Sequence, residues 1–528
     1  MALLRSFAIV GANTFGSRIL GFVRDILIAR ALGTGIVADA WVVAFRFPDL
    51  FRRLFVEGAF NAAFVPLFVR AVEDEGPEAA RRFAEDVMAV ILVALLTVTI
   101  VAEVAMPLVM HVLAPGFPRD GAAFPLAVNL TRLTFPYLLL VSLAALAGGL
   151  LNATGRFALT AAAPVLLNLV LIAAVTFGAR VFPDVGHALA WGVAFAGAMQ
   201  AGLLFVGAAR AGFPLRPRMP RLTPAVTRFL RLGVPGLVAG GATQINLLIG
   251  TMIATAVPGA PATLYYADRV YQLPTGLIGG ALGVVLLPEL ARRLSARDAQ
   301  AAADSFNRAL ELALLLALPA AAALVVIAVP IATMLFERGA FAADDTRRTA
   351  YALMAFGLGL PAFVLIKVFQ PGFFAREDTA TPLVLSIVGI AANVVLSLVF
   401  LFAIGWGGSG IALAGSAAGW LMALLLGARL LGGGGFALDG RFLRVAPRIL
   451  LATAVMAGVL YLAEPTLWPG AEATTLAKLI GLGLMVTGGL AVFGGACILL
   501  GVASPAELRR LLRKVDAPGP LAPGADGR

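Results

Sequence analysis

The chain has 528 residues, of which 60% are hydrophobic and only 13% are charged. A soluble domain carries about 25% charged residues, so this composition excludes a soluble globular protein and places most of the chain in lipid. The net charge of +11 would suggest a nucleic-acid partner in a soluble protein. Here we expect no such partner, because basic residues in a membrane protein mark the loops on one side of the bilayer.

Fourteen stretches of the chain are mostly apolar and 19 to 28 residues long, and a membrane-spanning helix needs about 20 such residues. In chain order they lie at 7–31, 36–60, 86–113, 125–151, 158–181, 187–209, 230–257, 263–288, 309–336, 349–372, 380–404, 409–432, 446–464 and 475–501. The first carries Arg18, Arg24 and Asp25 and is followed by no small-residue cleavage site, so we expect a retained helix rather than a signal peptide. The sequence therefore predicts an all-α integral membrane protein with about fourteen transmembrane helices.

Basic residues fall on alternate connections between these stretches. The basic connections hold Arg70, Arg81 and Arg82, then Arg156, then Arg210, Arg216, Arg218, Arg221, Arg228 and Arg231, then Arg292, Arg293 and Arg297, then Arg376, and then Arg441, Arg444 and Arg448. The connections 256–262 and 405–410 contain neither lysine nor arginine. By the positive-inside rule we expect both termini in the cytoplasm, which requires an even number of spans.

The two halves of the chain match each other at a constant offset. The matched pairs, at offsets of 222 to 225 residues, are Pro66 with Pro288, Pro107 with Pro330, Gly116 with Gly339, Pro136 with Pro361 and Asn168 with Asn393. The offset crosses six spans, so the two copies have the same orientation, as in transporters whose two lobes surround a central site. The repeat predicts an N-lobe at 1–220 with spans 1–6 and a C-lobe at 221–436 with spans 7–12. Residues 437–528 then form two additional helices and a cytoplasmic tail.

Eight basic residues remain inside the predicted spans, where each costs roughly 2.5–3.5 kcal/mol at a helix centre and needs a partner, a wet cavity or an interface. They are Arg18, Arg24, Arg46, Arg52, Arg53, Arg132, Arg269 and Lys367. One interpretation is structural ion pairing with the in-span acids Asp25, Asp39, Asp49, Glu57 and Asp268, or snorkelling to an interface. The other is an anionic substrate, because guanidinium groups match the oxygens of a diphosphate or carboxylate. The excess of arginine over acid favours the anion.

Several classes of enzyme and cofactor site are excluded by residue counts. The single cysteine, Cys497, excludes a disulfide and a redox pair, and the two distant histidines, His111 and His187, exclude a His-Glu-x-x-His metal site. No lysine follows a glycine, so a phosphate-binding P-loop is absent. We therefore expect no metal, no cofactor and no enzymatic activity, with a polyprenyl-diphosphate enzyme as the less favoured alternative.

Several blocks of residues resemble the MurJ (MviN) lipid II flippases. The blocks are 17–25, 38–40, 45–48, 61–66, 265–274 and 373–382. The resemblance implies a fold of the multidrug/oligosaccharidyl-lipid/polysaccharide exporter superfamily, which includes the MATE transporters, and two C-terminal helices that hold an undecaprenyl tail. It also implies a monomer in the bacterial inner membrane that moves lipid II, the undecaprenyl-diphosphate-linked peptidoglycan precursor, from the cytoplasmic to the periplasmic leaflet by alternating access. Another exporter of the superfamily is the alternative, and a drug exporter should have an acidic rather than a basic cavity.

The resemblance also implies roles for particular residues. Arginines that correspond to essential family residues are Arg18, Arg24, Arg52 and Arg269; acids that pair with or orient them are Asp25 and Asp39; and cavity-lining groups are Ser17 and Glu57. One departure concerns sodium, which some members are reported to bind with an acid on the seventh span. Here that span offers only Gln244 and Asn246, and Asp378 alone is a poor cation site, so we expect no sodium coupling.

Overall fold

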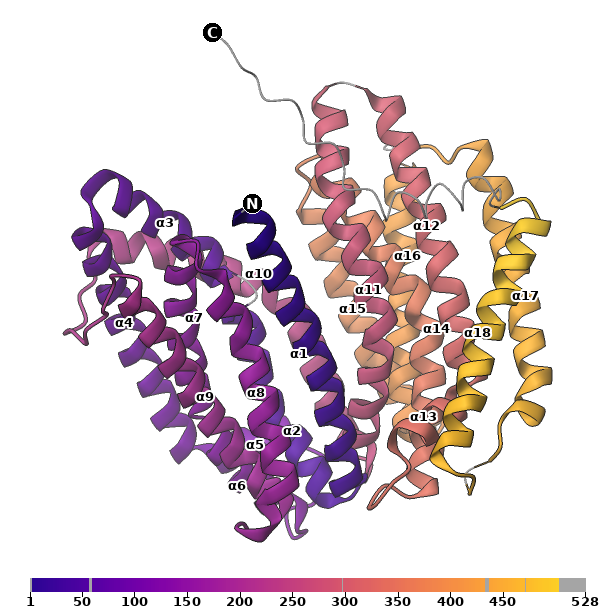
Figure 1. The fold of residues 1–528 in the computed structure, drawn as a ribbon, viewed down its shortest axis with the longest axis horizontal. Coiled ribbons are helices and arrows are strands. Elements are labelled where there is room, and N and C mark those ends of the chain that lie inside the picture. The colour runs from indigo at the N-terminus through magenta and orange to yellow at the C-terminus, as the bar shows by residue number, and fades with distance from the viewer. Residues whose placement is uncertain (1, 57–58, 297, 433–435, 471, 503–528) are drawn as a thin grey trace. The chain divides into compact units, whose positions relative to one another are not determined.

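The computed structural model describes residues 2–56, 59–296, 298–432, 436–470 and 472–502, and these residues form helices and no strand (Figure 1). The helices are α1 (Ala2–Leu32), α2 (Ile36–Val56), α3 (Ala59–Glu75), α4 (Pro77–Val104), α5 (Met106–Leu113), α6 (Ala123–Thr134), α7 (Tyr137–Ala153), α8 (Phe157–Phe177), η1 (Gly178–Arg180), α9 (Val185–Arg210), α10 (Pro224–Ala254), α11 (Ala260–Ser295), α12 (Ala299–Val326), α13 (Ala328–Phe336), α14 (Ala343–Phe374), α15 (Ala380–Leu398), the π-helical η2 (Val399–Ala403), α16 (Gly407–Gly432), α17 (Gly440–Leu467) and α18 (Thr475–Leu499).

The protein is a multi-pass membrane protein, and its all-helical class is confirmed. Within the described residues, ten helical segments are long and apolar enough to cross a membrane. The other four predicted spans correspond to α1, α2, α10 and α11. Three of these helices, α1, α2 and α11, carry most of the charged residues that lie inside predicted spans. Each predicted span therefore coincides with a long helix or a broken pair of helices, while the count of fourteen stays a prediction.

Two features of the helices go beyond the sequence-based picture. Helix α3 was not predicted, because its 17 residues contain the polar run Glu73-Asp74-Glu75 and are too few to span a bilayer. Some predicted spans are broken near a proline: α4 and α5 are separate helices around Ala105, and α12 and α13 are separate around Ile327. Other spans stay continuous through a proline, as α2 does at Pro48 and α14 at Pro361. Proline lacks the amide hydrogen that the helical ladder needs, which accounts for such breaks at Pro107 and Pro330.

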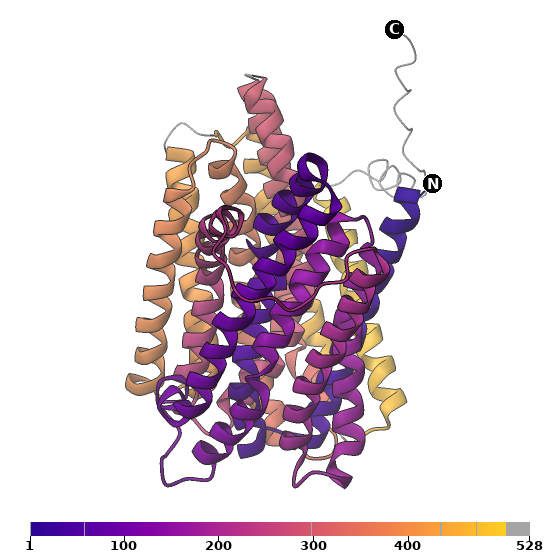
Figure 2. The ribbon, with the colours of Figure 1, turned by 90° about the vertical axis from the view of Figure 1, so that its left-hand side faces the viewer.

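The chain divides into two compact units, and their boundaries cut across several helices. The first comprises Met1–Val270, Leu335–Leu353 and Ser386–Ala418. Inside it α8 packs against both α1 and α9, α7 packs against α9, and α3 packs against α4 (Figure 2). An aromatic cluster joins α3 and α4 to the segment after α9, since Phe64 stacks on Phe83 and Phe68 contacts Phe213 edge-on.

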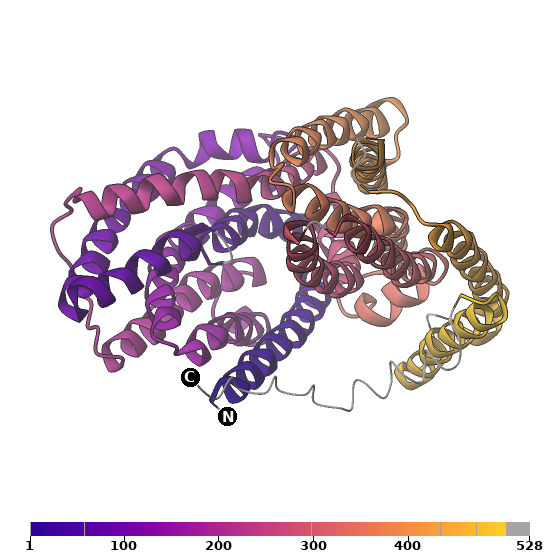
Figure 3. The same cartoon turned by 90° about the horizontal axis from the view of Figure 1, so that it is seen from above.

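The second unit comprises Tyr271–Met334, Met354–Leu385 and Gly419–Arg528. Its last two helices, α17 and α18, form a hairpin that packs on α12 through buried apolar residues such as Ile449, Met456 and Met485 (Figure 3). Asp439 caps the N terminus of α17 by accepting a 2.6 Å hydrogen bond from the amide of Phe442, and it also pairs with Arg308 on α12. The predicted lobe boundaries at 220 and 436 stay predictions.

Candidate functional site

A buried charged cluster joins α1 to α11 in the first unit. Arg24 is 6% exposed and Asp25 is 2% exposed. The Asp25 Oδ1 atom accepts hydrogen bonds from Arg24 Nε at 2.9 Å and Nη2 at 2.7 Å. Arg269 Nε lies 3.2 Å from Asp25 Oδ2 as an ion pair that lacks the alignment of a hydrogen bond. Three of the predicted site residues are therefore in contact, with two guanidinium groups on one carboxylate.

Tyr265 completes this cluster from one turn before Arg269 on α11. Its hydroxyl donates to Asp25 Oδ1 at 3.0 Å and accepts from Arg269 Nη2 at 3.3 Å. The Arg269 guanidinium also lies 4.7 Å from the centre of the Tyr265 ring, a cation–π contact. The spacing of four residues places both side chains on the same face of α11. We did not assign Tyr265 a role from the sequence, although it lies in one of the resembling blocks.

Asn168 on α8 is a further hydrogen-bond partner of Arg24. Its Oδ1 accepts from Arg24 Nη1 at 2.9 Å, and its Nδ2 donates to the backbone oxygen of Ser17 at 2.9 Å and to the Ser17 hydroxyl at 3.3 Å. Ser17, a predicted site residue, is therefore linked to Arg24 through Asn168. In the sequence, Asn168 stands out only as a marker of the repeat. Its match with Asn393 was the one available signal that it has a role, since a repeated polar residue in an apolar span needs a partner.

The remaining predicted residues lie outside this cluster. Arg18 is exposed. Arg52 and Arg53 share Asp49 on α2, at 2.9 Å and 3.0 Å, as the ion-pairing interpretation expects. Glu57 lies outside the described residues. The roles of these residues in substrate binding stay predictions.

Asp39 on α2 meets backbone amides at the start of α11. Its carboxylate accepts from the amide of Gly259 at 2.6 Å and from that of Ala262 at 3.0 Å. The positive end of the α11 dipole and its unpaired amides favour a carboxylate at this position. The contacts that the structure gives Asp39 are therefore with the backbone of α11, and its predicted action on the arginines stays a prediction.

Further contacts close the same end of the first unit. The α1–α2 turn contains Gly33 with φ +58°, whose carbonyl oxygen accepts from the Tyr266 hydroxyl at 3.1 Å. An added Cβ at Gly33 would lie 2.5 Å from the carbonyl oxygen of Ala340, so a larger residue does not fit without movement. Gly339 has φ +63°, and the amide next to it, from Ala340, donates to the backbone oxygen of Arg30 at 2.8 Å. Two glycines thus allow the α1–α2 turn and the α13–α14 connection to touch.

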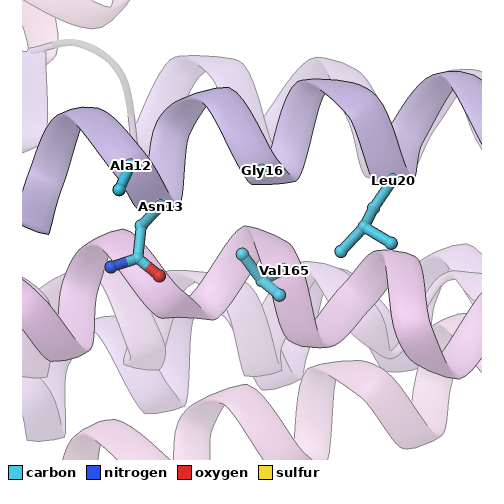
Figure 4. Close-up of a pocket in the computed structure, with 5 residues that line it drawn as sticks. All are labelled: Ala12, Asn13, Gly16, Leu20 and Val165. Carbon is cyan, nitrogen blue, oxygen red and sulfur yellow. The ribbon is translucent and has the colours of Figure 1, made fainter.

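A pocket of about 360 Å³ lies between α1 and α8, lined by Ala12, Asn13, Gly16, Leu20 and Val165 (Figure 4). It begins within a turn of Ser17, and its lining is mainly apolar and small.

Within the described part of the chain, no group of three His, Cys, Asp or Glu side chains is placed to hold a metal ion. Asp378 instead accepts from the amide of Thr381 at 2.9 Å, and this hydrogen bond lowers the pKa of the Asp378 carboxyl group.

The family model described as "Lipid II flippase MurJ" matches residues 28–476 of this chain. The chain belongs to the lipid II flippase MurJ family. The probable lipid II flippase MurJ of Rhizobium meliloti is 46% identical over 520 residues, covering 97% of each chain. The lipid II flippase MurJ of Burkholderia cenocepacia is 36% identical, covering 91% of this chain and 94% of the relative.

Solved structures agree with this membership of the MurJ family. A lipid II flippase MurJ in an inward closed conformation matches with a TM-score of 0.78 and 25% identity over 96% of this chain and all of that one. An inward-facing MATE multidrug transporter of the MOP superfamily matches with a TM-score of 0.68 and 15% identity over 79% of this chain. At that identity the MATE likeness shows the fold alone.

Proposed function

We propose that this chain is a lipid II flippase of the bacterial inner membrane, which carries the undecaprenyl-diphosphate-linked precursor of peptidoglycan from the cytoplasmic to the periplasmic leaflet. It acts as a transporter and makes or breaks no covalent bond. The observation that carries the proposal is the buried cluster in which Arg24 and Arg269 share Asp25. Because the chain belongs to the MurJ family, we take this cluster as the proposed binding site for the diphosphate of the substrate.

The charges of the cluster suit a diphosphate. Two guanidinium groups face one carboxylate, so the cluster keeps a net positive charge of one, and an entering diphosphate can replace Asp25 as their partner. Each guanidinium presents paired donors that match phosphate oxygens, and the hydrogen bonds are stronger in a buried site than in water. When the substrate binds, its diphosphate therefore replaces the Asp25 carboxylate as the partner of the two guanidinium groups, and neither arginine is left unpaired.

Alternating access requires that one end of the path be closed while the other is open. In the first unit the contacts of Asp39, Gly33 and Gly339 close the end of α1 and α11 that the positive-inside rule assigns to the periplasm. Both termini then lie in the cytoplasm, and the chain works as a monomer. The contacts are backbone hydrogen bonds to a carboxylate and close approaches at glycine, which can separate without loss of a covalent link.

The test is transport of labelled lipid II in proteoliposomes made with the purified full chain. We expect Arg24→Ala and Arg269→Ala each to reduce flipping at least a hundredfold, because each removes charge-assisted hydrogen bonds worth about 1.5–3 kcal/mol apiece. Either variant leaves Asp25 with its other arginine, so the fold should survive. Arg→Lys at either position should restore little, because an ammonium group does not reproduce the planar fork.

The matched control is Arg53→Ala. Arg53 is also an in-span arginine that shares a carboxylate with a second arginine, here Arg52 on Asp49. We expect this variant to flip lipid II at close to the normal rate. Wild-type flipping by the Arg24→Ala or Arg269→Ala variant would remove that arginine from the site, and recovery of a chemically altered lipid would indicate an enzyme instead.

A further inference from the structure

The strap that joins α9 to α10, residues 211–223, has no helix or strand and is unusually basic. It contains Arg216, Arg218 and Arg221 within six positions, and no acidic residue occurs anywhere between Asp184 and Asp268. Its charge is therefore not balanced by its own part of the sequence. The strap is also short. It follows α9, which is long and apolar enough to cross a membrane, and leads into α10, a predicted span, so it must stay close to the membrane surface.

Proline spacing gives the strap a stiff, extended form. Pro214, Pro217 and Pro220 recur every three residues, which is the repeat of a polyproline II helix, and Pro224 begins α10. With three residues per turn, positions 216, 219 and 222 share one side of the strap. The side chains at these positions are Arg216, Met219 and Leu222, so one side combines a charge with two apolar groups.

One side of the strap is anchored to the first unit. Phe213 is buried, Leu215 packs against the aromatic cluster of α3 and α4, and Glu85 on α4 is completely buried under the strap. Glu85 Oε1 accepts from the amide of Arg216 at 3.2 Å, and its Oε2 pairs with Arg218 Nε at 2.9 Å. The strap is therefore held with a fixed face outward.

The outward face combines charge with exposed apolar side chains. Met219 is 79% exposed and Leu222 is 72% exposed. Both lie in the strap rather than in a helix whose surface acyl chains would cover, so their exposure calls for another apolar partner. Arg216 lies on this face. Arg221 follows Leu215 and Arg218 in the three-residue repeat, but it lies beyond the anchored stretch and is exposed as well. The guanidinium groups of Arg216 and Arg221 form no ion pair with the described residues. Apolar side chains interleaved with arginines on a surface segment are the pattern that inserts into the headgroup region of an anionic bilayer.

We propose that this strap binds the anionic headgroups of the adjacent leaflet, with Arg216 and Arg221 on phosphate groups and Met219 and Leu222 inserted between them. An acidic protein or a nucleic acid would use the arginines but would leave both apolar side chains in water. A zwitterionic surface would accept the apolar side chains but would not favour the arginines. An anionic lipid surface satisfies both sets of groups at once.

The test is an environment-sensitive fluorophore on Met219→Cys in a full chain that also carries Cys497→Ala, reconstituted in vesicles. The matched control is Val181→Cys, because Val181 is equally exposed at 79% but lies in a connection without a run of arginines. As the phosphatidylglycerol content of phosphatidylcholine vesicles rises, we expect emission from position 219 to shift to the blue, with quenching by labelled lipids. Emission from position 181 should not change.

Two further arms test the source of the effect. Arg216→Gln with Arg221→Gln should weaken the response about thirtyfold, since each arginine near an anionic surface contributes about a fivefold gain. Salt at about 1 M, where the Debye length is only about 3 Å, should do the same. A full response in phosphatidylcholine alone would overturn the proposal, as would a response that disappears when residues 503–528 are removed, since the tail would then be the occupant.

Discussion

Asp25 occupies the position that an anionic substrate would take between Arg24 and Arg269. Its Oδ1 accepts three hydrogen bonds, two from Arg24 and one from Tyr265, while Oδ2 faces Arg269. A buried charge pair of this kind contributes little net stability, but loss of one partner leaves an uncompensated charge. We propose that the carboxylate acts as a stand-in anion, which keeps the two guanidinium groups in place while no substrate is bound.

Asp25→Asn should separate binding from transport. The amide keeps the size of the carboxylate but not its charge, so a diphosphate no longer competes with an anion for the two arginines. We expect a short-chain prenyl diphosphate to bind about tenfold more tightly, the equivalent of one charge-assisted hydrogen bond. Flipping should fall, because the arginines cannot return to a carboxylate when the substrate leaves.

Calorimetric titration of the purified variant measures the first effect, and the vesicle assay measures the second. Asp25→Glu, which keeps the charge, is the control and should resemble the wild type in affinity. Weaker binding by the Asp25→Asn variant would contradict the stand-in role and would assign Asp25 to substrate recognition instead.

The residues of this cluster differ in how well the sequence predicted them. Arg24, Asp25 and Arg269 were predicted, because a charge inside an apolar span is costly and conspicuous. Asn168 was not, because an uncharged amide in α8 costs less and gives no sign of which helix it faces. Contacts between α8 and α1 depend on packing across 144 positions of sequence, which no local pattern encodes.

At the scale of helices, the break between α4 and α5 explains which group Arg132 contacts. Pro107 has no amide hydrogen, so the carbonyl group of Glu103, four residues earlier, loses its helical partner. Arg132 Nε donates to that oxygen at 3.2 Å. Arg132 therefore has a structural contact, which is with a backbone carbonyl group rather than with one of the acids of the ion-pairing interpretation. In the second half the same break at Pro330 has Val326 in the position of Glu103.

Arg132→Met should lower stability rather than substrate affinity. The methionine keeps an apolar stem of similar length but removes the donor, so the carbonyl group of the half-buried Glu103 loses its partner, at a cost of about 1–3 kcal/mol. The midpoint of thermal unfolding in detergent measures the loss. Combining Arg132→Met with Pro107→Ala, which restores an amide at position 107, should recover part of it. An unchanged midpoint in the single variant would show that water replaces the guanidinium group.

The repeat extends to a polar contact between helices. Asn393 on α15 donates to Asn246 on α10 at 2.8 Å, and Asn393 and Asn168 are partners in the repeat. The residue at the place of Arg24 in the second copy is thus the neutral Asn246, at an offset of 222 residues. Both copies join their first and fifth spans by a polar pair, and only the first copy carries the charge. We infer that the repeat preserved the contact and that the N-lobe specialised for anion binding.

The hairpin of α17 and α18 lies outside the repeat, and we propose that it holds the prenyl tail. Val455 and Val459 on α17 are 44% and 42% exposed, one turn apart on the same face. Replacing both with threonine puts hydroxyl groups on an apolar surface and should weaken flipping of the long-chain substrate several-fold. A short-chain analogue should be unaffected. The same change at Val384 and Val395 on α15 is the control, and equal loss for both chain lengths would contradict a tail site.

For the whole molecule, hydropathy predicted where the long helices lie, because the bilayer requires apolar segments of a set length. It did not predict α3 or the helix breaks, which depend on amphipathic surface packing and on single prolines. The periodic placement of arginine on alternate loops predicted an orientation, and this orientation determines the direction in which a substrate charge crosses the membrane potential.

Membrane potential is the energy source that this arrangement of charges favours. Moving one charge through 100 mV is worth about 2.3 kcal/mol, so a diphosphate of about −2 that leaves a negative interior gains on the order of 4–5 kcal/mol. After release, Arg24 and Arg269 outnumber Asp25 by one charge, and a positive cluster is drawn back toward the negative side. Both halves of the cycle then run downhill electrically, without a nucleotide or a dedicated sodium site.

Proteoliposomes with a potassium gradient test this directly. Valinomycin sets the potential, and we expect flipping to slow at least tenfold as the potential falls from 100 mV to zero, since about 2.3 kcal/mol per charge is lost. Removing sodium, or collapsing only the pH gradient, should change the rate little. Asp25→Asn adds one positive charge to the empty cluster, so its return step should depend more steeply on the potential. A rate that is unchanged at zero potential but lost without sodium would refute the electrical mechanism, and would direct attention to Gln244 and Asp378 as ion ligands.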